Sequence, residues 1–225
     1  MFKQILMLVT AALVGCTPAA PPQNNPSPLN IEPPSYVLIV VLDLSGSYAK
    51  FMDDGKAWNA VSKTIREFYR NRMGEHDKLV IGQISGVTVA PIFSGSPKAF
   101  GRECQSAGSF KDLLKKNSDP NGSPVHASTE ATLRYGMQFM SPSNNTFLAV
   151  FSDFDENFPE PEKTETKLVA TLAEFARKGG ACGCYWLSLG QVSKWHANLV
   201  KAGFPSNKMV VSGIIEAEPA FPQFD

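Results

Sequence analysis

The chain has 225 residues, 43% of them hydrophobic, and its 21 basic and 21 acidic residues give a formal net charge of zero at pH 7. This length and apolar content are sufficient for one domain with a real hydrophobic core. The neutral balance argues against a nucleic-acid partner, because binding to nucleic acid requires a basic surface patch.

The first residues have the pattern of a signal peptide, which we place at 1–15. Lys3 precedes an apolar run over 5–14 that is too short to span a membrane as a helix. The run ends in Leu-Val-Gly before Cys16, which resembles the bacterial lipobox. The resemblance implies cleavage before Cys16 and acylation of its thiol, which would anchor the protein to a membrane of the bacterial cell envelope. The alternative is an ordinary signal peptide followed by an unmodified cysteine.

The segment 16–35 is predicted to be an extended tether between the lipid anchor and the domain. It is rich in proline, asparagine and serine and has almost nothing to bury, a composition typical of semi-rigid linkers. The domain is expected to occupy 36–225, and the sequence shows neither an internal repeat nor a second domain.

A buried strand is predicted for 36–42, which is apolar without a break and rich in valine and isoleucine. Such a run is typical of a strand covered on both faces in a parallel sheet. Asp43, Ser45 and Ser47 follow at a spacing of two. Because ligands of open α/β sheets bind beyond the carboxyl ends of the strands, these three side chains lie where such folds place their chemistry.

The remaining elements alternate between amphipathic helices and short apolar strands. The helices are predicted at 53–73, 110–115, most of 122–140, 164–178 and 192–202, and the strands at 78–84, 87–93, 146–151, 182–189 and 208–211. A Ser-Gly turn at 85–86 makes 87–93 the antiparallel partner of 78–84. The alternation predicts an α/β fold with a doubly wound, mostly parallel sheet, one antiparallel edge strand and helices on both faces.

Two further loops carry oxygen-bearing side chains. The residues GSPV at 122–125 open a helix, and SDF at 152–154 follow a buried strand. Together with the Asp-x-Ser-x-Ser pattern at 43–47, they resemble, in the same order, the three motifs of the metal-ion-dependent adhesion site in the von Willebrand factor A (vWA) family. The resemblance extends over nearly the whole chain from Tyr36.

The resemblance implies a set of metal ligands, which are Asp43, Ser45, Ser47, Ser123 and Asp153. Ser123 stands where the family usually has threonine and keeps the hydroxyl; Thr129, inside the following helix, is the alternative third hydroxyl. Phe154 stands where the family usually has glycine, which is a departure at the turn after Asp153.

Hydroxyl and carboxylate oxygens suit hard cations, here Mg²⁺, or Ca²⁺ or Mn²⁺. The resemblance implies that the serines bind directly, that the carboxylates often act through water, and that the metal keeps an open position for an acidic side chain of a protein partner. The expected function is a membrane-anchored, cation-dependent module for adhesion or assembly, and not an enzyme. We expect Asp43 on the rim of the domain, outside the core.

Two alternatives stay open. A vWA domain without metal would act as an envelope scaffold, and its serines would form turns and helix caps. A metal-dependent phosphotransfer enzyme would use Asp43 with Asp153 and Asp155. Haloacid-dehalogenase phosphatases, however, need a second aspartate where Ser45 stands, and the sequence has neither a Gly-x-Ser-x-Gly elbow nor a glycine-rich phosphate loop.

The other cysteines and one histidine complete the candidates. Cys182 and Cys184 are expected on the same face of one strand. They are interpreted as small apolar core residues in preference to partners of a disulfide with Cys104 in an oxidising envelope. His126 is near the candidate site in sequence and is expected to be a surface histidine at a helix start.

Overall fold

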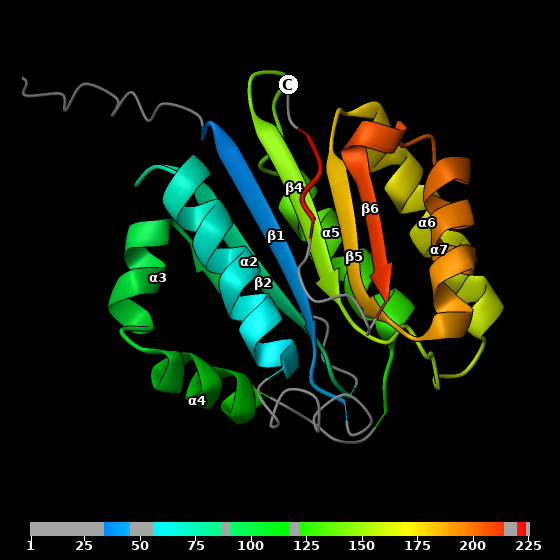
Figure 1. The fold of residues 1–225 in the computed structure, drawn as a ribbon, viewed down its shortest axis with the longest axis horizontal. Helices are drawn as coiled ribbons and strands as arrows, with labels where there is room; N and C mark the ends of the chain where they lie inside the picture. Colours follow the sequence, from blue (N-terminus) through cyan, green and yellow to red (C-terminus); the bar gives the residue numbers. More distant parts are fainter. Residues whose placement is uncertain (1–33, 46–55, 87–90, 118–121, 214–219, 224–225) are drawn as a thin grey trace, which may run out of the picture. The chain divides into compact units, whose positions relative to one another are not determined.

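The computed structural model describes residues 34–45, 56–86, 91–117, 122–213 and 220–223 (Figure 1). The predicted signal peptide, Cys16, nearly all of the tether and Ser47 lie outside the described residues. The chain divides into two units, and the described residues all belong to the unit Glu32–Asp225. No helix among the described residues has both the length and the apolar content needed to cross a membrane.

A six-stranded sheet with the order β3-β2-β1-β4-β5-β6 is the centre of this unit. Its strands are β1 (Tyr36–Asp43), β2 (Lys78–Ile84), β3 (Phe93–Gly95), β4 (Asn145–Phe151), β5 (Ala181–Leu187) and β6 (Met209–Gly213). All neighbouring strands are parallel except β2 and β3. This confirms the predicted mostly parallel sheet with one antiparallel edge strand.

The β1 strand is central because both of its faces are apolar. Leu38, Val40 and Leu42 belong to one core cluster, whereas Val37, Ile39 and Val41 alternate with them into the other. Its parallel neighbours β2 and β4 pair with it along nearly its whole length. The unbroken apolar run was therefore a correct signal for a doubly covered strand.

Helices pack on both faces of the sheet, as predicted (Figure 1). The first core cluster contains residues of α2 (Lys56–Arg72) and α4 (Ala107–Asn117), with α3 (Pro97–Glu103) packed beside them. The second cluster contains residues of α5 (Val125–Met137), α6 (Pro161–Arg177) and α7 (Leu189–Lys201). A short 3-10 helix, Ser206–Lys208, leads into β6.

Between β2 and α4 the structure differs from the prediction in two elements, a strand and a helix. The third strand pairs antiparallel with β2, as expected, and its described part is Phe93–Gly95, with Phe93 opposite Ile81. Of the predicted range 87–93, residues 87–90 lie outside the described residues. The α3 helix was not predicted, although Pro97 stands at its first turn and the Ser96 hydroxyl accepts a hydrogen bond from the amide of Ala99 at 3.2 Å. Both are ordinary helix-start signals.

The three cysteines among the described residues are free thiols, and they lie on opposite faces of the sheet. Cys182 and Cys184 are buried in the second cluster with their sulfur atoms 4.0 Å apart, whereas Cys104 packs against the first cluster. The sheet therefore separates Cys104 from the other two. Their interpretation as core residues is confirmed for the buried pair, and the disulfide alternative is wrong.

Candidate metal centre

The carboxyl ends of β1 and β4 bring Asp43 and Ser152 into contact. Asp43 is the last residue of β1, and Ser152 follows the last residue of β4. The Ser152 hydroxyl donates to Asp43 Oδ2 at 2.6 Å, and the Ser45 amide donates to Asp43 Oδ1 at 2.9 Å. Both carboxylate oxygens thus accept a hydrogen bond from within the domain.

Asp43 is fully buried, so the expectation that it lies on the rim is wrong. The end of a central strand is enclosed by the neighbouring strands and their loops, and the Leu44 amide still donates to the carbonyl of Ile84 at 3.0 Å. Burial raises the pKa of Asp43 from 3.8 to about 6; the hydrogen bonds from Ser152 and Ser45 oppose this rise, and the charge of Asp153 adds to it. A nearby cation would favour the ionised form of such a group.

The loop after β4 makes its turn with an unusual backbone conformation. Phe154 has φ +60°, a left-handed value that is rare for a bulky side chain. Its amide donates to the Ser152 hydroxyl at 2.9 Å, and its buried ring lies 4.6 Å from that of Trp195 in α7. The departure from glycine therefore keeps the turn, and burial of the ring offsets the backbone strain.

Asp153 lies at the same edge of the sheet and is 6% exposed. Its Oδ1 accepts a hydrogen bond from the Asp155 amide at 3.1 Å. Its carbonyl accepts one from the Ser188 amide at 3.2 Å, next to the start of α7. Because Asp153 raises the pKa of Asp43, the two carboxylates act on one another electrostatically.

The loop before α5 brings Ser123 to this edge. The Gly86 amide, just beyond β2, donates to the carbonyl of Gly122 at 3.4 Å, and the Ser123 amide donates to Asn157 Oδ1 at 2.7 Å. Ser123 is fully buried, and within the described part of the chain its hydroxyl has no hydrogen-bond partner. The hydroxyls of Thr129 and Ser128 are likewise buried and have no hydrogen-bond partner within the described residues. The choice between Ser123 and Thr129 as a ligand stays a prediction.

Sequence reasoning gave Asn157 and Glu156 no structural role, and it placed His126 wrongly. Glu156 Oε2 accepts from the His126 amide at 2.9 Å and lies 3.4 Å from His126 Nδ1. His126 is only 2% exposed, so the expectation of a surface histidine is wrong. The reason is that its ring lies 5.6 Å from Trp195 and 3.2 Å from the Thr164 hydroxyl, under the start of α6. Burial lowers the pKa of His126, and the charge of Glu156 opposes this effect.

The donor chemistry of the described residues fits a hard divalent cation. Asp43 and Asp153 supply carboxylates, and Ser45 and Ser123 supply hydroxyls, as Mg²⁺, Mn²⁺ or Ca²⁺ prefer. A buried hydroxyl without a partner, that of Ser123, is an atom that a ligand would satisfy. The described residues contain no group of three His, Cys, Asp or Glu side chains able to hold a metal. A site made of two carboxylates and several serine hydroxyls does not require such a group of three. The ligand set stays a prediction.

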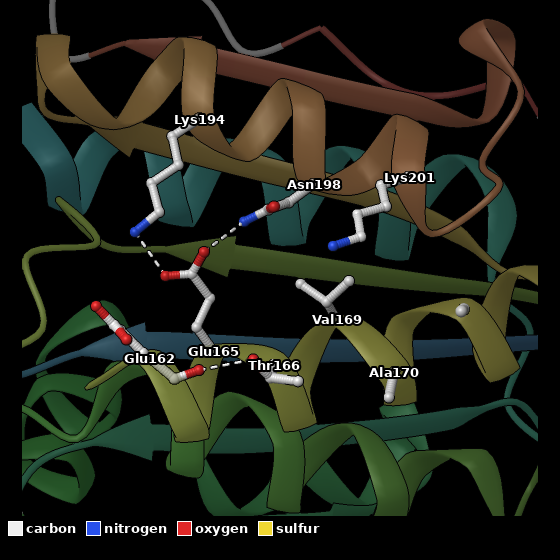
Figure 2. Close-up of a pocket in the computed structure, with 9 residues that line it drawn as sticks. Glu162, Glu165, Thr166, Val169, Ala170, Lys194, Asn198 and Lys201 are labelled. Carbon is white, nitrogen blue, oxygen red and sulfur yellow. Dashed lines mark hydrogen bonds and ion pairs between the residues drawn. The ribbon is translucent and has the colours of Figure 1, made fainter. Parts of the chain in front are cut away.

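A separate groove of about 560 Å³ lies between α6 and α7 (Figure 2). Glu165 of α6 is paired with Lys194 of α7 at 2.5 Å and accepts from Asn198 at 3.0 Å. Figure 2 shows the side chain of Lys201 in α7 next to Val169 of α6. None of the candidate cation ligands lines this groove. The polar contacts of Glu165 connect the two helices across this groove. The groove is distinct from the candidate metal centre.

Solved structures with a similar fold include vWA domains. The SpRpn10 VWA domain has a TM-score of 0.52 at 11% identity, over 85% of this chain and 91% of that one. Manganese-loaded TRAP protein from Plasmodium vivax has a TM-score of 0.52 at 11% identity, over 79% and 69%. The pilus adhesin SpaC from Lactobacillus rhamnosus GG has a TM-score of 0.53 at 11% identity, over 80% of this chain and 28% of the adhesin.

No protein-family model and no curated protein matches the sequence. Identities near one in ten establish the fold and nothing finer. The mostly parallel six-stranded sheet with one antiparallel edge strand and helices on both faces is an α/β architecture consistent with this fold. The domain that contains the candidate metal centre therefore has the vWA fold.

Proposed function

We propose that this protein is a membrane-anchored protein-binding module whose binding surface is completed by a divalent cation. The observation that carries the proposal is the chemistry at one edge of the sheet. A buried carboxylate, Asp43, lies there with its pKa raised by burial, and the buried Ser123 hydroxyl has no partner among the described residues. Both features are what a bound cation would relieve.

The residues that would hold the cation are Asp43, Ser45, Ser123 and Asp153, together with Ser47 as expected from the sequence. When bound, the cation would supply an electrophilic position for an acidic side chain of a protein partner. One structural neighbour, the TRAP protein, is manganese-loaded, which supports cation use in this fold. Mg²⁺, Mn²⁺ and Ca²⁺ are all compatible with oxygen ligands.

Thermal unfolding with millimolar MgCl₂, MnCl₂ or CaCl₂, against a chelator, tests the cation. A ligand that binds only the folded state raises its stability, by about 1.4 kcal/mol at ten times Kd. We expect Ser123→Ala to lose this shift and Thr129→Ala to keep most of it. Ser128→Ala is a matched control, because it removes another buried, unpartnered hydroxyl near the same helix start. If Thr129→Ala loses the shift and Ser123→Ala keeps it, Thr129 is the third hydroxyl ligand.

Anchoring and partner capture need separate measurements. Mass spectrometry of the native N-terminus is expected to show removal of 1–15 and an acylated Cys16; an intact N-terminus would contradict the anchor. Partner capture from envelope extract is expected to depend on the cation and to disappear in chelator. The localisation proposed is the bacterial cell envelope, with the domain held off the membrane by the tether.

A metal-independent scaffold is the second candidate, and one observation favours it. Both oxygens of Asp43 already accept hydrogen bonds, from Ser152 and Ser45, so the hydrogen bonding of this carboxylate does not depend on a cation. Identical melting temperatures in cation and in chelator would favour the scaffold. The phosphotransfer alternative has less support, because Asp155 is exposed and accepts from Ser188 and Gln191.

A further inference from the structure

Two side chains of the loop after β4 accept hydrogen bonds from the backbone at the start of α5. Asn157 Oδ1 accepts from the Ser123 amide at 2.7 Å, and Glu156 Oε2 accepts from the His126 amide at 2.9 Å. The partners are 34 and 30 residues apart in sequence. The first amides of a helix have no acceptor within the helix, so acceptors from elsewhere decide how the helix start is held. We call Glu156 and Asn157 the loop clamp.

The Glu156 carboxylate is itself held in place. Its Oε1 accepts from the Phe158 amide at 3.0 Å, and its side chain is only 5% exposed. Its Oε2 also lies 3.4 Å from His126 Nδ1, whose ring contacts the Thr164 hydroxyl of α6. A carboxylate at a helix N-terminus is favoured by the helix dipole. Glu156 therefore holds the helix start from a buried, hydrogen-bonded position.

The clamp joins the two loops that carry different candidate ligands. Asp153 precedes the clamp residues in the same loop, and that loop is tied to the start of α7 by the hydrogen bond from the Ser188 amide to the Asp153 carbonyl. Ser123 belongs to the other loop, and its amide donates to the clamp residue Asn157. The loop of Asp153 and the loop of Ser123 are thus connected directly by hydrogen bonds.

We infer that Glu156 and Asn157 are positioning residues that set the Ser123 hydroxyl relative to Asp153 and thereby determine how tightly the site holds a cation. This inference rests on the proposed function. Groups that orient metal ligands without touching the metal typically change affinity by about 10- to 100-fold when removed. Asn157 is the better residue to change, because it is exposed and outside the core.

The experiment compares Asn157→Leu, which removes the acceptor at similar size, with Asn157→Asp, which keeps it. Titration calorimetry with MnCl₂ is expected to show affinity weakened about tenfold in Asn157→Leu and retained within about threefold in Asn157→Asp. Asn198→Leu is the control: it removes an amide that contacts Glu165 in the α6–α7 groove and is expected to leave affinity unchanged.

Amide hydrogen exchange in chelator provides the second readout. Exchange at the Ser123 amide is expected to accelerate in Asn157→Leu and not in Asn157→Asp. Unchanged Mn²⁺ affinity in Asn157→Leu, or weakened affinity without faster exchange at Ser123, overturns the inference alone. A wild-type protein that shows no response to MnCl₂, MgCl₂ or CaCl₂ overturns the proposed function and the inference with it.

Discussion

At the end of β1 the Asp43 carboxylate accepts a hydrogen bond at each oxygen, whereas around the start of α5 three buried hydroxyls have no partner in the described part of the chain. These hydroxyls are those of Ser123, Ser128 and Thr129. A buried charge is too costly to leave unsatisfied, but a buried hydroxyl without a partner costs only about 1–3 kcal/mol. The carboxylate oxygens therefore have their hydrogen bonds within the domain, although burial still disfavours the charge of Asp43, whereas the three hydroxyls have no described hydrogen bond at all.

The same chemical change in the two regions gives the largest expected contrast. Ser152→Ala removes the donor to Asp43 Oδ2 and the acceptor of the Phe154 amide. We expect it to lower the free energy of unfolding by about 3 kcal/mol in chelator at pH 7, measured by urea denaturation. Ser128→Ala removes a hydroxyl that has no described partner, so it should not destabilise the protein and should raise the free energy of unfolding by up to about 1–3 kcal/mol. Equal losses in the two variants would contradict the contrast.

Asp43→Asn tests the cost of the buried charge. The pKa of Asp43 rises from 3.8 to about 6 on folding, so between these values the folded state binds more protons than the unfolded state. Stability from this group is therefore present below pH about 4, is lost as pH rises to about 6, and stays lost above it. A shift of about two pKa units corresponds to about 3 kcal/mol.

In chelator at pH 7, Asp43→Asn is thus expected to raise the free energy of unfolding by about 1–2 kcal/mol, less than the full value because its amide pairs imperfectly with the Ser152 hydroxyl. Below pH 4 the advantage should disappear. Urea denaturation at a series of pH values measures the gain in stability at pH 7 and its disappearance below pH 4. The variant is also expected to lose the stabilisation by cation. An advantage that persists unchanged at pH 3 would show that its source is not the ionised carboxylate.

Two substitutions of Phe154 test the left-handed backbone conformation after β4, and the stability difference expected between them is the smallest. Both Phe154→Ala and Phe154→Gly lose the buried ring that packs on Trp195 and should be clearly less stable than the wild type. Because φ is +60°, glycine adopts this conformation without strain and alanine does not. We therefore expect Phe154→Gly to be more stable than Phe154→Ala by about 1 kcal/mol, the reverse of the order in a helix. Thermal unfolding of both variants decides the order.

Most of the fold could be predicted from local pattern. The unbroken apolar run of β1 identified the central strand, and the amphipathic pattern at 53–73 indicated α2, whose Trp58 and Phe68 lie in the core. The third strand continues to Gly95, beyond its predicted end at Phe93, because a Ser-Gly turn signal does not report how far the pairing with β2 extends. The α3 helix was overlooked although its Ser-Pro start was visible.

The sequence alone determined which residue types follow the carboxyl ends of the strands, because apolar periodicity and the polar residues next to it are local properties. Only the tertiary structure decided their environment. Burial of Asp43 and His126 depends on neighbouring strands and helices distant in sequence, so no local pattern reports it. The contacts of Asn157 with Ser123 and of Glu156 with His126 join residues 30 or more positions apart. Such pairings exist only once the sheet has brought the two loops together, and for that reason the residues that organise the site were missed while its candidate ligands were not.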